Sequence, residues 1–129
     1  MKKETKPQKT SPVEARRKAI KLYLTGLEVK SIECPILGKN VDIVAGSIRE
    51  TAVHAAKSER STLAVFRIGE AIKKAKYVKL HAPKDGKQSS MNFVKIHELK
   101  AFLSGIGEVK IIVGERQNKR ILHYCITAK

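Results

Sequence analysis

Residues 47–75, with the sequence SIRETAVHAAKSERSTLAVFRIGEAIKKA, decide the fold. The segment Ser47-Ile48-Arg49-Glu50 has the pattern of a capping box, in which a hydroxyl and a carboxylate satisfy the free N–H groups at a helix start. It predicts a helix from Ser47 to Lys57. From Ser61 to Ala75, apolar residues recur at helical spacing, with Ser61 and Thr62 as the expected N-cap. The segment therefore predicts two central helices.

The residues that follow have strand patterns. A hairpin turn at Gly105-Ile106-Gly107 favours a strand over a helix for residues 93–104, which fit both periods. The other expected strands cover residues 76–80, 108–113 and 120–127, and a polar loop covers 82–90. We therefore predict an α+β fold in which two helices cover one face of an antiparallel sheet of about four strands. The other face would stay open, and Lys110 and His123 are expected to project from it.

The N-terminal part adds a tail, a helix and a hairpin. Residues 1–10 are polar and rich in Lys, which predicts a flexible basic tail. Ser11-Pro12-Val13-Glu14 predicts the start of a short helix that Gly26 ends. Residues 28–33 and 41–44 predict a hairpin. Residues 11–129 are thus expected to form a single domain, in keeping with a length of 129 residues.

The net charge points to an anionic partner. The chain has 27 Lys and Arg against 12 Asp and Glu, a net charge of +15, and this self-repulsion opposes a compact state. RNA is the partner we expect first, and an anionic membrane surface or an acidic, antitoxin-like protein are the alternatives. A Lys-rich surface also favours solubility, which is the simplest explanation of the charge.

Compartment signals are few. The segment Met1-Lys2-Lys3-Glu4 has no apolar run after it, so we expect no signal peptide, and no run of 18 apolar residues predicts a membrane span. The two cysteines, Cys34 and Cys125, could pair but nothing in their spacing requires it. The expected compartment is the cytoplasm, with both thiols reduced.

One face of the first central helix carries candidate catalytic groups. Glu50, His54 and Lys57 follow each other at i, i+4 and i+7, and Arg49 lies at the edge of this face. Cleavage of RNA without a metal needs a group that removes the 2′-hydroxyl proton and one that protonates the leaving oxygen, and His54 suits either task. Arg49 and Lys57 would stabilise the charge on phosphorus. The alternative is an ordinary solvent-facing Glu–His pair.

Further candidates would bind the substrate. Lys110 and His123 could contact phosphate from the open face, and Ser61 and Thr62 could do so at the start of the second helix. His81, His97 and His123 are otherwise typical of surface or turn positions. The sequence has no CxxC or HExxH pattern and no clustered Asp pair, so we expect neither a metal nor another cofactor.

A resemblance adds to these patterns. Residues 47–62 resemble the signature of a domain found in polyvalent proteins of phages and conjugative elements, and the segments 109–114 and 124–127 resemble its closing strands. It is similar to the large polyvalent-protein-associated domains assigned to the barnase–EndoU–colicin–RelE-like nuclease class, over roughly residues 40–128. The resemblance implies two helices, four strands and a metal-independent ribonuclease, a toxin-like effector of a mobile element. Many relatives have two adjacent histidines, whereas Val53 here precedes His54.

Two other functions remain open on the sequence alone. A basic domain with few aromatic residues could bind RNA or DNA through phosphates without cutting it, and such binding would depend steeply on salt. The basic surface could instead be an interaction site for an acidic protein. The RNA sequence that is recognised and the oligomeric state leave no mark in the sequence.

Overall fold

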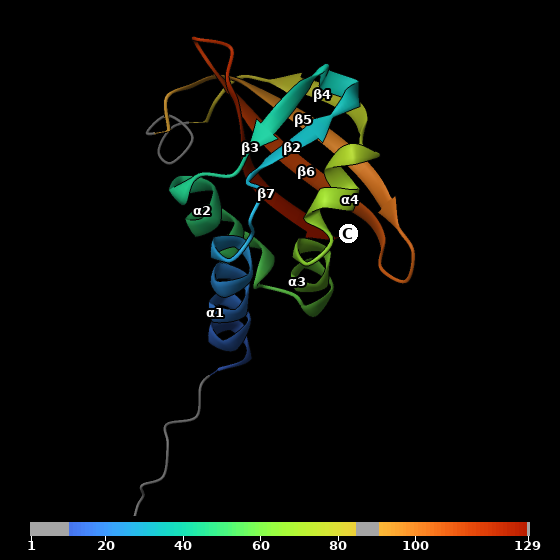
Figure 1. Ribbon diagram of the computed structural model, residues 1–129. Helices are drawn as coiled ribbons and strands as arrows, with labels where there is room; N and C mark the ends of the chain where they lie inside the picture. Colours follow the sequence, from blue (N-terminus) through green and yellow to red (C-terminus); the bar gives the residue numbers. More distant parts are fainter. Residues whose placement is uncertain (1–10, 85–90, 129) are drawn as a thin grey trace, which may run out of the picture.

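The computed structural model describes residues 11–84 and 91–128, which fold into four α-helices and a six-stranded sheet. The predicted tail at residues 1–10 and most of the predicted loop at 82–90 lie outside the described residues. In Figure 1, α1 and α3 lie at the lower end of the fold, and the strands β2 to β5 lie above them. The α+β class is therefore confirmed, with one more helix than predicted and with the predicted N-terminal hairpin joined to the sheet.

Helix α1 (Pro12–Thr25) follows the sequence prediction closely. The Ser11 hydroxyl accepts a hydrogen bond from the Glu14 N–H at 3.1 Å, Pro12 occupies the first turn, and Gly26 is the C-cap. Ile20 and Leu24 are fully buried, and they attach α1 to the core next to α2 (Ala45–Ala55). The N-cap and the apolar spacing of α1 could both be predicted because each depends only on residues close in the sequence.

Both central helices begin two residues earlier than predicted. Helix α2 begins at Ala45, and Ser47 lies in its first turn, where its hydroxyl accepts the Val44 N–H at 3.1 Å. Helix α3 (Glu59–Val65) is capped by Ser58, whose hydroxyl accepts the Ser61 N–H at 3.0 Å, so Ser61 is not the N-cap. Ser58 is three residues closer to α2 than expected, which shortens the connection between the two helices.

The predicted helix over 61–75 is in fact two short helices. After α3, the chain turns at Phe66 and Arg67 and resumes as α4 (Ile68–Lys73). The Phe66 carbonyl accepts a hydrogen bond from the Tyr23 hydroxyl of α1 at 3.1 Å, so it is satisfied outside a helical ladder. Ile68 and Ile72 remain buried, which explains why the apolar period continued through the break.

The sheet has the strand order β2-β3-β7-β6-β5-β4. Its strands are β2 (Ser31–Cys34), β3 (Lys39–Asp42), β4 (Lys76–His81), β5 (Phe93–Leu103), β6 (Gly107–Arg116) and β7 (Ile121–Ala128), and the 3-10 helix η1 (Pro35–Leu37) joins β2 to β3. The strand over 93–103 and the Gly105–Gly107 turn are confirmed, with φ of 84° at Gly105 and 104° at Gly107. The prediction of about four antiparallel strands was wrong in detail, because β3 pairs in parallel with β7 and thereby adds the N-terminal hairpin to the sheet.

Two irregularities in the strands decide which side chains reach which face. In β4, Tyr77 pairs with Leu99 but Lys79 pairs with Glu98, so Val78 is an extra residue. In β7, Cys125 pairs with Ile112 but His123 pairs with Val113, so Tyr124 is an extra residue. Each bulge reverses the alternation of its strand, and the side chains beyond it change faces.

One face of the sheet is covered by the helices and forms the main core. Leu99, Ile111 and Ile126, from three neighbouring strands, are completely buried there together with Val65 and Ile72 of the helices. The opposite face, here called the open face, carries the side chains of the alternate residues. They include Lys76, Lys79, His81, Glu98, Lys100, Phe102, Lys110, Ile112, Cys125 and Thr127. Farther along this face, Ile96 and Leu122 are buried in a second, smaller apolar cluster with Tyr124 and Cys125.

Helices α2 and α3 also close the edge of β7. Because β3 pairs with β7 only at Ile121 and Leu122, the rest of this strand would leave its outer backbone groups unpaired. The Thr51 hydroxyl donates to the Tyr124 carbonyl at 3.1 Å, and the Ala128 N–H donates to the Ser61 hydroxyl at 2.8 Å. These bonds hold α2 and α3 along the edge of β7.

Cys34 and Cys125 are both buried and do not form a disulfide. None of the helices within the described residues has the length and apolar composition to cross a membrane.

Candidate functional site

A cavity of about 310 Å³ opens where α2 meets the open face. Its walls come from α2 and from the four strands β4 to β7, so they combine segments far apart in the sequence. The lining residues are His54, His81, Ala82, Lys84, Ile96, Glu98, Lys110, Ile112, Tyr124, Cys125 and Thr127. Two imidazoles and two ammonium groups thus share one hollow with a carboxylate, a phenol and a hydroxyl.

His54 enters the cavity from α2 and is held by two neighbours. Its Nε2 lies 3.8 Å from Oε1 of Glu50, one turn earlier, and its ring lies 5.7 Å from that of Tyr124. The Tyr124 hydroxyl donates to the same Glu50 oxygen at 3.4 Å. Burial, followed by the charge of Glu50, raises the pKa of Tyr124 to about 12, so the phenol stays protonated and remains a donor. Tyr124 and Glu50 together fix the position of the imidazole.

Glu50 itself lies in the interior. Only 3% of its surface is exposed, so the alternative of an ordinary solvent-facing Glu–His pair does not hold. Strand β7 and the Tyr124 phenol cover this side of α2. A buried carboxylate needs partners, and here it has a phenol and an imidazole.

His81 enters from the end of β4 and is paired with Glu98 of β5. Its Nε2 lies 2.8 Å from Oε1 of Glu98, and roughly a third of its side chain is exposed. The hydrogen bond from His81, with the nearby charge of Lys110, lowers the pKa of Glu98 despite some burial. An ionised Glu98 can only accept, so His81 Nε2 donates the hydrogen of this bond.

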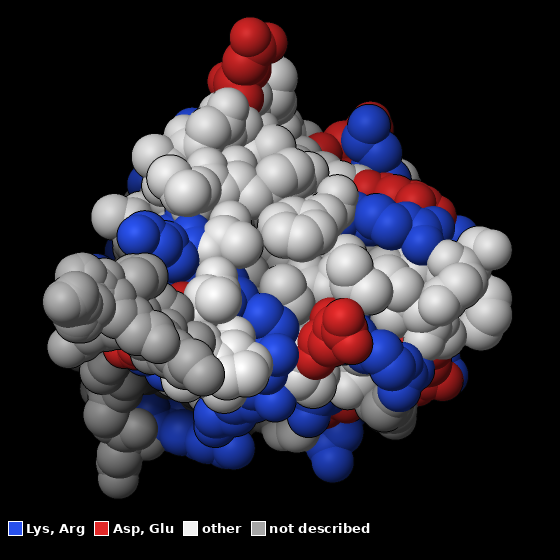
Figure 2. Space-filling view, turned by 90° about the horizontal axis from the view of Figure 1, so that it is seen from below, with Lys and Arg blue, Asp and Glu red and all other residues white. Residues whose placement is uncertain are grey.

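The cations of the cavity come from the strands rather than from α2. Lys110 of β6 lies opposite Lys100 of β5 on one side and Thr127 of β7 on the other, and Lys84 follows the end of β4. Positive charge is unevenly spread elsewhere too, since Lys and Arg collect along the lower part of the face in Figure 2, with a few acidic side chains among them. An anion entering the cavity would meet ammonium groups beside two imidazoles.

The predicted catalytic residues are separated by the structure. His54 lines the cavity, whereas Arg49 and Lys57 are exposed on α2 or just after it and are not among the lining residues. The two predicted substrate hydroxyls are buried in structural roles. Ser61 accepts the Ala128 N–H, and the Thr62 hydroxyl donates to the carbonyls of Ala55 and Ser58, at 3.1 and 2.9 Å.

His123 does not project from the open face. It is completely buried on the covered face, and among the described residues neither of its ring nitrogens has a hydrogen-bond partner. Burial lowers its pKa from 6.5 to about 3, so the ring is neutral at physiological pH. Simple alternation would place His123 on the same face as Cys125 and Thr127, but the bulge at Tyr124 turns it inward.

Sequence reasoning missed several residues of the cavity. His81 was taken as a turn residue, and Glu98 and Tyr124 were given no role, yet all three line the hollow. The pairing of His81 with Glu98 depends on the register between β4 and β5, which a long connection separates. Cys125 also lines the cavity, but burial raises the pKa of its thiol to about 12, which leaves it protonated and a poor nucleophile.

Within residues 11–84 and 91–128, no group of three or more His, Cys, Asp and Glu side chains is arranged to hold a metal ion. The acid–base groups at the cavity are paired as His54 with Glu50 and His81 with Glu98.

Comparison with protein families gives one match. The family described as large polyvalent protein-associated domain 3 matches residues 10–124, which covers most of the chain. The chain belongs to this family. Comparisons with curated proteins and with solved structures give no match.

The family match agrees with the polyvalent-protein resemblance and extends it. It starts before α1, whereas the resemblance covered only residues from about 40 onward. Helix α1 and the β2–β3 hairpin therefore belong to this polyvalent-protein domain. The cavity residues up to Tyr124 lie within the matched range.

Proposed function

We propose that this polyvalent-protein domain is a metal-independent endoribonuclease that uses His54 and His81 as its acid–base pair. The observation that carries the proposal is that these two histidines, from α2 and β4, line the same cavity beside Lys110. Transfer of the phosphoryl group to the 2′-oxygen needs one proton acceptor and one proton donor, and a single histidine would have to serve as both.

His81 is suited to be the base. Its Nε2–H is directed at Glu98, and the free lone pair on Nδ1 can accept the proton of the ribose 2′-hydroxyl. The 2′-oxygen then attacks phosphorus, so that the bond from phosphorus to the 2′-oxygen forms as the bond to the 5′-oxygen breaks. The products are a 2′,3′-cyclic phosphate and a free 5′-hydroxyl.

His54 is suited to be the acid. In its protonated form it would give a proton to the departing 5′-oxygen, and Glu50 and Tyr124 would keep the ring oriented for that transfer. Lys110 would stabilise the charge that builds on the non-bridging phosphate oxygens. The residue before His54 is Val53, so no adjacent histidine is available, and His81 would supply the second imidazole from a strand.

The test is cleavage of total RNA in the presence of EDTA by the wild type, His54→Ala and His81→Ala. Removal of an acid or base is expected to slow cleavage by about a hundredfold or more for each variant, with 2′,3′-cyclic phosphate ends in the wild-type products. His97→Gln is the matched control, because His97 pairs with Tyr77 and Glu115 on the covered face. It should cut at close to the wild-type rate.

Other outcomes would point to other functions. Cleavage that survives both alanine substitutions would remove the histidine pair from the mechanism. Salt-dependent binding of RNA without cleavage by any variant would favour a non-catalytic nucleic-acid-binding domain. Recovery of an acidic protein with the purified domain, and no affinity for RNA, would favour the protein-partner alternative.

A further inference from the structure

Three lysines form a row across the open face. Lys76 of β4 is directly opposite Lys100 of β5, and Lys100 is directly opposite Lys110 of β6. Neighbouring strands lie about 4.8 Å apart, so the three lysine side chains leave one face of the sheet from adjacent positions. Like charges directly opposite each other destabilise a sheet, and a bound polyanion would offset that cost.

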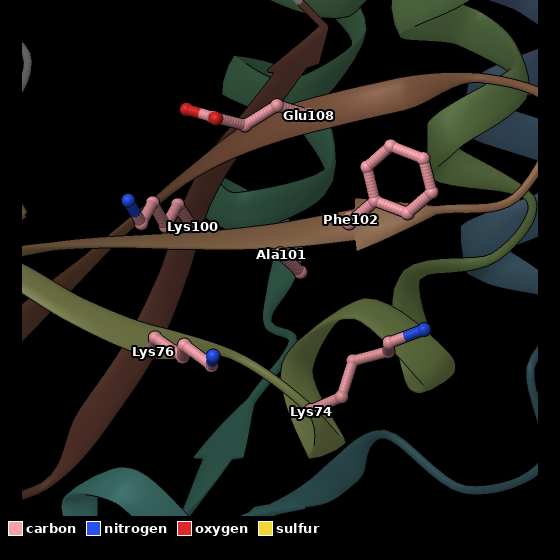
Figure 3. Close-up of a pocket in the computed structure, with 6 residues that line it drawn as sticks. All are labelled: Lys74, Lys76, Lys100, Ala101, Phe102 and Glu108. Carbon is pink, nitrogen blue, oxygen red and sulfur yellow. The ribbon is translucent and has the colours of Figure 1, made fainter.

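An exposed aromatic side chain lies beside this row. Phe102 is two residues beyond Lys100 on β5, so both share the open face, and 64% of the phenylalanine is exposed. The two border a hollow of about 290 Å³ together with Lys74 and Lys76. In Figure 3 the ring of Phe102 stands at one side of the hollow, while Lys76 and Lys100 lie farther along the strands.

The hollow also has acidic neighbours. Glu108 borders it opposite Phe102 on β6, and Glu70 accepts a hydrogen bond from Lys74 Nζ at 3.3 Å. With Lys76 and Lys100, the net charge around the lysine row nevertheless stays positive. At its other end the row reaches Lys110, which borders the cavity of His54 and His81.

We propose that the lysine row and Phe102 bind single-stranded RNA, with phosphates along Lys76, Lys100 and Lys110 and one base stacked on the Phe102 ring. A base must be unpaired to offer its face to an aromatic side chain, so a single strand fits this surface and a duplex does not. An acidic protein would use the lysines but has no base face for the ring. The placement of the cut beside the row rests on the proposed ribonuclease function; the binding itself does not.

Binding is best measured with a probe that cannot be cut. A fluorescent single-stranded RNA with 2′-O-methyl riboses lacks the attacking hydroxyl, so its anisotropy reports affinity whether or not the domain is a nuclease. Loss of one stacked base in Phe102→Ala should weaken binding by about tenfold, and Phe102→Trp should restore it. The affinity for a blunt RNA duplex should be unchanged in both variants.

The contribution of the lysines to RNA binding is measured by the dependence of affinity on salt concentration. The logarithm of the binding constant falls with the logarithm of the salt concentration, and each phosphate contact on a single strand adds about 0.7 to that slope. Lys100→Ala should therefore flatten the slope by about 0.7, whereas Lys21→Ala, on the exposed surface of α1, should leave it as in the wild type.

The outcomes separate this proposal from the ribonuclease proposal. Equal affinity of Phe102→Ala and the wild type would overturn the stacking site, as would an equal loss for single strand and duplex or full displacement of the RNA by polyglutamate. If binding depends on Phe102 but no RNA is cut, the single-strand binding site is supported and the ribonuclease proposal is refuted. If His54 and His81 are needed for cleavage but Phe102 is not needed for binding, the reverse holds.

Discussion

Strands β4 and β7 each contain a bulge and each carry a histidine near it, but the two bulges have opposite consequences. In β4 the extra residue Val78 turns His81 to the open face, where it pairs with Glu98. In β7 the extra residue Tyr124 turns His123 into the core, where its ring is completely buried. The same side chain is thus a candidate base in one strand and an inert core residue in the other.

The comparison shows that the bulges, rather than the residue type, decide whether a histidine side chain faces the cavity or the core. Without the bulges, His81 would share the covered face with Tyr77, and His123 would share the open face with Cys125 and Thr127. Tyr124, the residue that forms the second bulge, also contacts His54 and Glu50. One backbone feature therefore removes a histidine from the surface and supports another beside the cavity.

The largest expected effect concerns stability in acid. Burial lowers the pKa of His123 from 6.5 to about 3. Between pH 6.5 and pH 3, His123 is therefore protonated in the unfolded chain but neutral in the folded chain. This contribution to stability is fully present above pH 6.5 and is lost as the pH falls toward 3, by about 3 kcal/mol at pH 4. Denaturant unfolding at several pH values measures it.

The matched variant is His123→Leu, which has no group to protonate. Its stability should fall less steeply between pH 6.5 and 4 than that of the wild type. A wild-type slope that His123→Leu does not change would contradict the assignment of His123 to the interior.

A smaller loss is expected where α2 covers the β7 edge. Thr51→Val keeps the shape of the side chain but leaves the Tyr124 carbonyl, inside the protein, without its donor, which should cost about 1–2 kcal/mol. Thr127→Val is the control, because this residue lies half-buried at the cavity. Thermal unfolding of both variants checks the difference, and equal melting temperatures would show that α2 does not depend on this bond.

The smallest expected change tests Glu98 as a positioning residue for His81. Glu98→Gln should slow RNA cleavage by about tenfold, because the amide no longer fixes the ring with the proton on Nε2. Nitrogen NMR of the His81 ring should change from one tautomer to a mixture. The control Glu33→Gln, on the exposed part of β2, should alter neither the rate nor the spectrum. A pure Nε2–H tautomer in Glu98→Gln would rule out this role.

Local signals explain what the sequence could predict. The Ser11 cap, Pro12 and Gly26 define α1, and the glycine turn at 105–107 decides that residues 93–103 form a strand. These features depend on neighbours within a few residues, so they can be predicted without knowledge of the fold. The α+β class followed from them, and so did the position of His54 on a helix.

Non-local packing explains what the sequence could not predict. The parallel pairing of β3 with β7 joins residues about 80 positions apart, and no local pattern marks it. Bulges at Val78 and Tyr124 are selected by side chains of the neighbouring strands, so simple alternation gave the wrong face for His123. The burial of Glu50 could not be predicted, because its partner, Tyr124, comes from the other end of the chain.

The central claim is that His54 and His81 face one anion-binding cavity from which His123 is excluded. Titration of the wild type with uridine 3′-monophosphate, followed by NMR of the histidine rings, tests it without reference to activity. The signals of His54 and His81 should shift together with a single Kd, and those of His123 should stay unchanged. A shift of only one of the pair, two different Kd values, or a shift of His123 would contradict the claim.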